Sequence, residues 1–150
     1  MNVFKHSLFA ASVILTMPAT CEACDALVGS ILTANLKPAI EDLDCSILGK
    51  AGLDKKGHKL VSVCYESSGP ASHVRVNASL NCHTSDRALI PASVSENVSV
   101  DADVSGADCQ SKDVRVQASG EITKGLLKAF GANGKAGEAL QKGLNQACKR

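Results

Sequence analysis

The stretch Val74-Arg75-Val76-Asn77-Ala78-Ser79-Leu80-Asn81 alternates apolar and polar side chains at every residue. Since successive side chains of a β-strand point to opposite faces, this pattern predicts a strand with one buried side and one solvent-facing side. The same alternation recurs at residues 61–65, 94–104 and 114–118, with turn segments containing Ser, Gly or Pro between or beside them. The sequence therefore predicts four strands joined by short to medium connections into an antiparallel meander.

Helical spacing flanks the predicted strands on both sides. Apolar residues recur at three- and four-residue steps over residues 25–48 and again over 122–148, where residues 131–134 mark a bend or cap. Pro38 lacks a backbone donor and clashes with the preceding turn, so we expect two helical pieces or a kink there. The predicted class is α+β: an N-terminal helical segment, a four-stranded antiparallel sheet and a C-terminal helical segment, stapled by disulfides. Helices cover one sheet face and leave the other polar.

The first residues have the features of a signal peptide. Residues 1–6 contain one lysine, residues 7–17 form an uncharged apolar run that Pro18 ends, and Cys21 and Ala23 place small residues where a signal peptidase cuts. We expect cleavage after Ala23. The chain then divides into a signal peptide, residues 1–23, and a single disulfide-stabilised α+β domain, residues 24–150. That domain would be secreted or periplasmic.

Cleavage after Ala23 reduces the seven cysteines to six, an even number that three disulfides would use up. On the predicted meander, two of the six lie at one end of the sheet and two at the other. The remaining two lie at the outer ends of the helical segments. The expected pairs are Cys45–Cys82, Cys64–Cys109 and Cys24–Cys148, one of the many pairing schemes that six cysteines allow.

Motifs for catalysis or metal binding are incomplete in this sequence. Residues 101–106 match the opening of a calcium loop, but Lys112 stands where the closing bidentate Glu is required. The histidines His58, His73 and His83 lie in three different places, without a partner at helical ligand spacing. No Gly-x-Ser-x-Gly motif is present. We therefore expect a protein that is not an enzyme and that uses no metal or other cofactor.

Two glycosylation sequons begin at Asn77 and Asn97, and both would carry glycans only in a source with the required machinery. The formal net charge is +1. Proteins that bind nucleic acid usually carry a clear basic surplus, so the charge argues against a nucleic-acid partner. No stretch after the leader reaches the length of a membrane-spanning helix, so we expect no transmembrane segment.

Three functional hypotheses remain. The leading one is a small exported non-catalytic binding protein, because an interior of Val, Leu and Ala with few aromatic residues suits an apolar or lipidic ligand. The alternative is a secreted protein–protein interaction module, such as an inhibitor, an immunity factor or an effector. The third is a membrane-active protein with peripheral membrane contact, in which the basic C-terminal helix presents a membrane or partner face. That face would consist of Lys124, Leu127, Lys128, Phe130 and Lys135.

Overall fold

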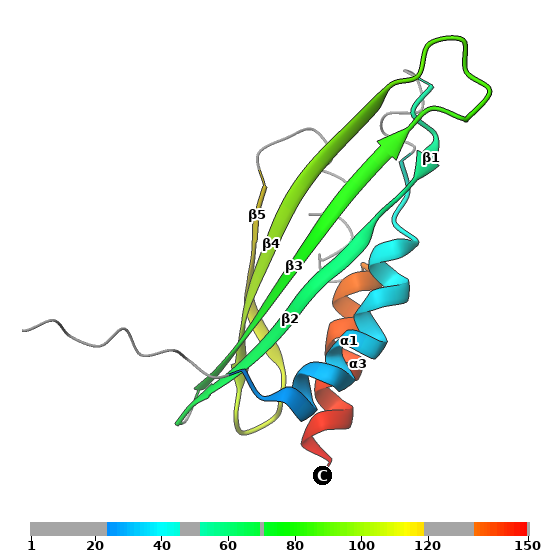
Figure 1. The fold of residues 1–150 in the computed structure, drawn as a ribbon. Coiled ribbons are helices and arrows are strands. Elements are labelled where there is room, and N and C mark those ends of the chain that lie inside the picture. The colour runs from blue at the N-terminus through cyan, green and yellow to red at the C-terminus, as the bar shows by residue number, and fades with distance from the viewer. Residues whose placement is uncertain (1–23, 46–51, 70, 119–133, 150) are drawn as a thin grey trace, which may run out of the picture.

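A computed structural model describes residues 24–45, 52–69, 71–118 and 134–149 of the chain (Figure 1). Within these ranges the protein has two helices and one antiparallel sheet of five strands, which confirms the predicted α+β class. The expected signal peptide, residues 1–23, lies outside the described residues. So do residues 119–133, which include the first part of the predicted C-terminal helical segment.

The sheet follows the predicted meander, with one strand more than the sequence indicated. Strand β3 lies in the centre, with β2 on one side and β4 on the other, and β5 follows β4. The additional strand, β1, pairs with β3 in front of β2, from which only Gly57 and His58 separate it. The strands are β1 (Lys55–Lys56), β2 (Lys59–Ser68), β3 (Ala71–His83), β4 (Ser93–Ser105) and β5 (Ser111–Gln117).

Helix α1 (Ala26–Glu41) begins at a side-chain cap and runs through its proline. The carboxylate of Asp25 accepts hydrogen bonds from the backbone N–H groups of Leu27 and Val28, both at 2.9 Å. The expected division into two helical pieces is wrong, because Pro38 stands in the last turn and removes only one hydrogen bond there. The helix ends at Glu41, and residues 43–45 are not helical. The expected extension to residue 48 therefore fails as far as the chain is described.

Helix α3 (Lys135–Cys148) runs opposite to α1, and both helices cover the same face of the sheet (Figure 1). Each helix contributes fully buried leucines, and β3 and β4 contribute every second residue. No helix among the described residues is long and apolar enough to cross a membrane. The core side chains of these four elements are Leu32, Leu36, Ile40, Val74, Val76, Ala78, Leu80, Cys82, Val98, Val100, Ala102, Val104, Ala136, Leu140 and Leu144.

All six cysteines from Cys24 onward form disulfides, but two of the three pairs differ from the expected scheme. The structure joins Cys45 to Cys82, as expected, and also joins Cys24 to Cys64 and Cys109 to Cys148. The expected Cys64–Cys109 pair is wrong because β2 and β4 lie on opposite sides of β3. Strands two positions apart are separated by about 9–10 Å, and a disulfide needs Cα atoms within about 7 Å. The expected Cys24–Cys148 pair is wrong because each helix is instead stapled to the sheet beside it.

Candidate functional site

The loop between β3 and β4, residues 84–92, forms the tip of the longest hairpin in the described chain and projects beyond both helices (Figure 1). We call this loop the hairpin tip. It carries Leu89 and Ile90, whose exposed fractions are 101% and 80%. Large apolar side chains that are this exposed contribute nothing to the core. Apolar side chains gathered on a surface are typical of contact sites for other molecules.

Hydrogen bonds between its two ends close the hairpin tip. The backbone N–H of Thr84 donates to the carbonyl of Ala92 at 3.0 Å, and the N–H of Ala92 donates to Thr84 Oγ1 at 3.2 Å. Inside the loop, the N–H of Ala88 donates to the carbonyl of Ser85 at 2.9 Å. Hydrogen bonds within the loop therefore hold its conformation without a partner.

A buried disulfide and a buried histidine support the base of the hairpin. Cys45 and Cys82 are 3% and 0% exposed, and His58 is 6% exposed. His58 Nδ1 accepts a hydrogen bond from the N–H of Asn81 at 3.1 Å. Its Nε2 therefore carries the proton and donates to the carbonyl of Leu43 at 3.1 Å. Burial lowers the pKa of His58, so the ring is a neutral cross-link between the two segments.

The same three side chains bring ligand atoms together but do not fit a metal ion. The two sulfurs and the His58 ring nitrogen lie within 4.8 Å of one another. The sulfurs are bonded to each other, so neither is a thiolate. A metal ion on Nε2 would also require the ring proton on Nδ1, where the N–H of Asn81 already points. The second such cluster, Cys24, Cys64 and Glu66, likewise contains a disulfide.

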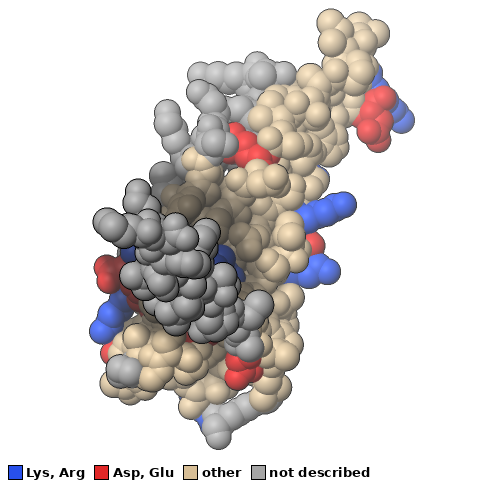
Figure 2. Space-filling view, turned by 60° about the vertical axis from the view of Figure 1, so that its left-hand side comes forward, with Lys and Arg blue, Asp and Glu red and all other residues tan. Residues whose placement is uncertain are grey.

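Charged side chains of both signs surround the base of the hairpin tip. An open hollow there is lined by Asp54, Lys55, Lys56, His83, Ser85, Asp86 and Arg87. Lys56 pairs with Asp42 and lowers the pKa of that carboxyl, and Lys55 lies 3.9 Å from Asp54. Figure 2 shows an uncharged end at the top of the molecule with basic and acidic side chains together below it. The surroundings of the tip therefore have no surplus of positive charge.

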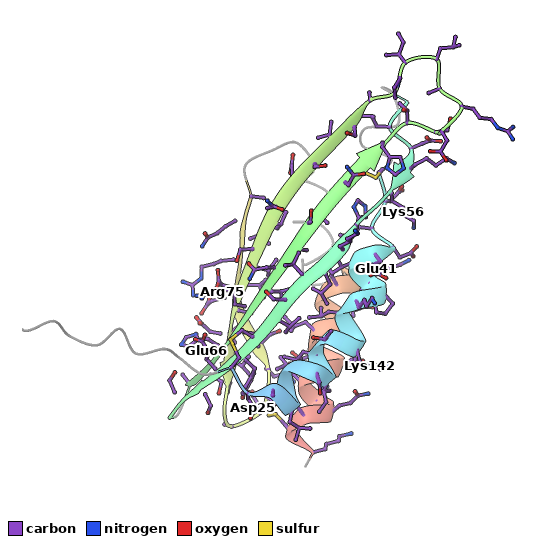
Figure 3. All side chains as sticks on the ribbon, viewed as in Figure 1. Asp25, Glu41, Lys56, Glu66, Arg75 and Lys142 are labelled. Atoms are coloured by element: carbon purple, nitrogen blue, oxygen red, sulfur yellow. A yellow bond between two sulfur atoms is a disulfide. The ribbon has the colours of Figure 1, made fainter. Side chains whose placement is uncertain are left out.

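The sheet face that points away from the helices, which we call the open face, carries a second group of charges. Figure 3 shows Glu66 and Arg75 on this side. Arg75 donates to Asp101 at 2.8 Å, and His73 Nδ1 lies 2.6 Å from Asp103, which Arg115 also contacts at 3.2 Å. Asp101 and Asp103 thus lie on the solvent side of β4, where their alternation placed them. These side chains link neighbouring strands and line an open hollow on this face.

The structure distributes the other predicted site residues over several places. Asn77 and Asn97 lie on the open face, in β3 and β4. Lys135 is exposed at the start of α3, while Lys124, Leu127, Lys128 and Phe130 lie outside the described residues. Sequence reasoning missed the hairpin tip. Its signal is an aliphatic pair followed directly by Pro91 between two alternating segments, where a polar turn is usual.

Comparison with known proteins gives one family. A family model described as Y4fE matches residues 30–148, which include all five strands, α3 and most of α1. No curated protein and no solved structure matches the chain.

Proposed function

Since the chain belongs to the Y4fE family, whose description names no activity, we propose a function from its surface. The protein is a small exported, non-catalytic binding protein that attaches to a protein partner through the hairpin tip. The observation that carries this proposal is the exposure of Leu89 and Ile90 on a loop that the fold holds in place.

The energetics of the tip favour binding. Burial of one large aliphatic side chain against a partner contributes about 1.5–3 kcal/mol. A loop that is already ordered loses less conformational entropy on binding than a disordered one. The closing bonds between Thr84 and Ala92 and the disulfide at Cys82 supply that order. Leu89 and Ile90 can therefore act as anchor residues in the cleft of a partner.

The shape and charge of the tip favour a protein over the other two ligand classes. An apolar small molecule needs a concave apolar pocket, whereas the tip projects outward and the hollow at its base is lined mainly by polar side chains. Attachment to an anionic membrane is strengthened by a surplus of Lys and Arg. The cations Lys55 and Lys56 already face the acids Asp54 and Asp42.

The disulfides support the proposal of export. Three disulfides persist in an oxidising compartment, such as the extracellular space or the periplasm, and are rare in the cytosol. The proposed cleavage after Ala23 is consistent with this pattern, because it would remove Cys21 and leave an even number of cysteines.

The experiment compares three immobilised forms of the chain from residue 24 onward: wild type, the double variant Leu89→Ser/Ile90→Ser, and Val61→Ser. Val61 is a matched control because it is 65% exposed but lies in β2. All three should fold alike, since the altered side chains are exposed. Wild type and the control should retain the same stoichiometric partner from the native compartment, and the double variant should lose it. Equal retention by all three, or no partner for wild type, would refute the proposal.

A further inference from the structure

Three consecutive rows of the open face pair an asparagine with a serine across β3 and β4. The pairs are Asn77–Ser99, Ser79–Asn97 and Asn81–Ser95, so the asparagine alternates between the two strands. The two sequons therefore lie opposite each other, each asparagine beside the serine of the other. We call these six residues the amide–hydroxyl platform.

The middle row of the platform, Ser79 and Asn97, differs from the outer rows in its hydrogen bonds. In the outer rows, Asn81 donates to Ser95 Oγ at 2.6 Å, and Asn77 donates sideways to Ser62 Oγ of β2 at 3.0 Å. Within the described part of the chain, no side-chain hydrogen bond is formed by Asn97, Ser79 or Ser99. Asn97 is exposed and the two serines are half-buried. Among the described residues, no side chain occupies the donors and acceptors of their amide and hydroxyl groups.

Strand stability does not account for this composition. Asparagine is depleted in β-strands, and threonine is the hydroxyl residue that strands favour. None of the strands β2–β5 contains threonine, yet the platform has three asparagines and three serines. The six platform residues are all uncharged, although Arg75 and Asp101 occupy the next row of the same face and Lys59 of β2 pairs with Ser79.

We propose that the amide–hydroxyl platform binds a neutral carbohydrate chain. Each amide and each hydroxyl group can both donate and accept, which matches the hydroxyl groups of a sugar. None of the platform's six side chains is charged, and Lys59 of β2 borders the middle row beside Ser79. Its rows follow one another about 7 Å apart along the strands, so an extended chain of sugar units meets the same chemistry repeatedly.

The platform is separate from the anchor residues of the hairpin tip, so the two sites can be tested independently. The proposal of carbohydrate binding also depends on whether the two sequons carry glycans, which can be checked directly. Asn77 and Asn97 are the asparagines of the sequons, and glycans attached to them would cover the platform. The proposal therefore requires that both asparagines be unmodified in the native protein.

The test is a nitrogen-15 NMR titration of the chain from residue 24 onward with neutral hexasaccharides of the cello, chito and laminari series. We expect saturable shifts of the side-chain amide signals of Asn77, Asn81 and Asn97. The double variant Asn97→Ala/Ser79→Ala should lose them, whereas Asn145→Ala, which removes an exposed amide on α3, should keep them. The variant Leu89→Ser/Ile90→Ser should also keep the sugar-induced shifts. A failure of the proposed partner binding can therefore be distinguished from a failure of the proposed carbohydrate binding.

A second variant separates binding from strand stability. Asn97→Thr should raise the melting temperature, because threonine suits a strand better, and should weaken the sugar-induced shifts at least several-fold. The proposal is overturned if none of the three hexasaccharides causes saturable shifts, or if the shifts persist in Asn97→Ala/Ser79→Ala. It is also overturned if the Thr variant binds as wild type does, or if the native mass shows N-linked glycans.

Discussion

The ring of His58 accepts a hydrogen bond from the backbone N–H of Asn81 at 3.1 Å, although the two residues are 23 positions apart in the sequence. The other ring nitrogen donates to the carbonyl of Leu43. One buried, neutral imidazole thus joins the segment after α1 to the strand that leads into the hairpin tip. A second proton on this ring would break the bond to Asn81.

Stability should therefore depend on pH through His58. Burial lowers the pKa of this histidine from its ordinary value of 6.5 in the folded state, so the unfolded chain takes up the proton first as the pH falls. The contribution of His58 is fully present above pH 6.5 and is lost as the pH falls from there toward the lower folded pKa. Urea unfolding between neutral and mildly acidic pH should show this loss.

The variant for this test is His58→Gln. It should unfold with a smaller dependence on pH in the same range, because the titrating ring is gone. An unchanged dependence in His58→Gln would contradict the assignment.

The three disulfides should differ in their contribution to stability. The sequence separations are 40, 37 and 39 residues, so the constraint on the unfolded chain is nearly equal, at about 2–4 kcal/mol each. Burial distinguishes them, because Cys45 and Cys82 are both buried while Cys24 and Cys148 are exposed. Replacing Cys45 and Cys82 by Ala should thus lower the unfolding free energy most, as measured by urea titration. Equal losses for all three pairs would show that burial adds nothing.

The sequence predicted the four long strands and the polar open face because alternation is a local property. The sequence predicted disulfides from a count, because six cysteines, an even number, follow Ala23. The pairing depends on distances across the sheet, and Cys64 and Cys109 illustrate this. Both lie toward the same end of the meander, but β3 runs between β2, which contains Cys64, and β4, which Cys109 follows. The distance between Cys64 and Cys109 depends on the order of the strands in the sheet, which the local alternation of apolar and polar residues does not predict.

The candidate sites were harder to predict than the fold. The exposure of Leu89 and Ile90 depends on how far the β3–β4 hairpin extends beyond the helices, and no local pattern reports that length. The platform depends on register, because a shift of one residue would turn Asn97 away from Ser79. The sequence shows both sequons, and only the pairing of the strands shows that they lie side by side.

The side chain of Asp25 should determine how well α1 begins. Its carboxylate satisfies two backbone N–H groups that would otherwise lack a partner in the first turn. Asp25→Ala should lower the unfolding free energy by about 0.5–2 kcal/mol, while Asp25→Asn should cost less because asparagine is also a good N-cap. Urea unfolding checks both variants. Equal losses would mean that the negative charge, and not the cap, is what matters.

Gly143 allows α3 to pack closely against α1. A larger residue at this position should therefore lower the unfolding free energy. A Cβ atom at this position would lie 2.9 Å from Cδ2 and 3.4 Å from Cα of Leu32, whose side chain is 0% exposed and has little space to move. Alanine favours a helix over glycine by up to about 1 kcal/mol, whereas overpacking costs about 1–3 kcal/mol. Gly143→Ala should therefore be destabilising, by up to about 2 kcal/mol. In α1, Gly29→Ala is the matched control, because its Cβ would meet only the carbonyl of Val63, at 3.4 Å. Thermal and urea unfolding should show a neutral or slightly stabilised control, and a stabilised Gly143→Ala would mean that the two helices can separate without loss.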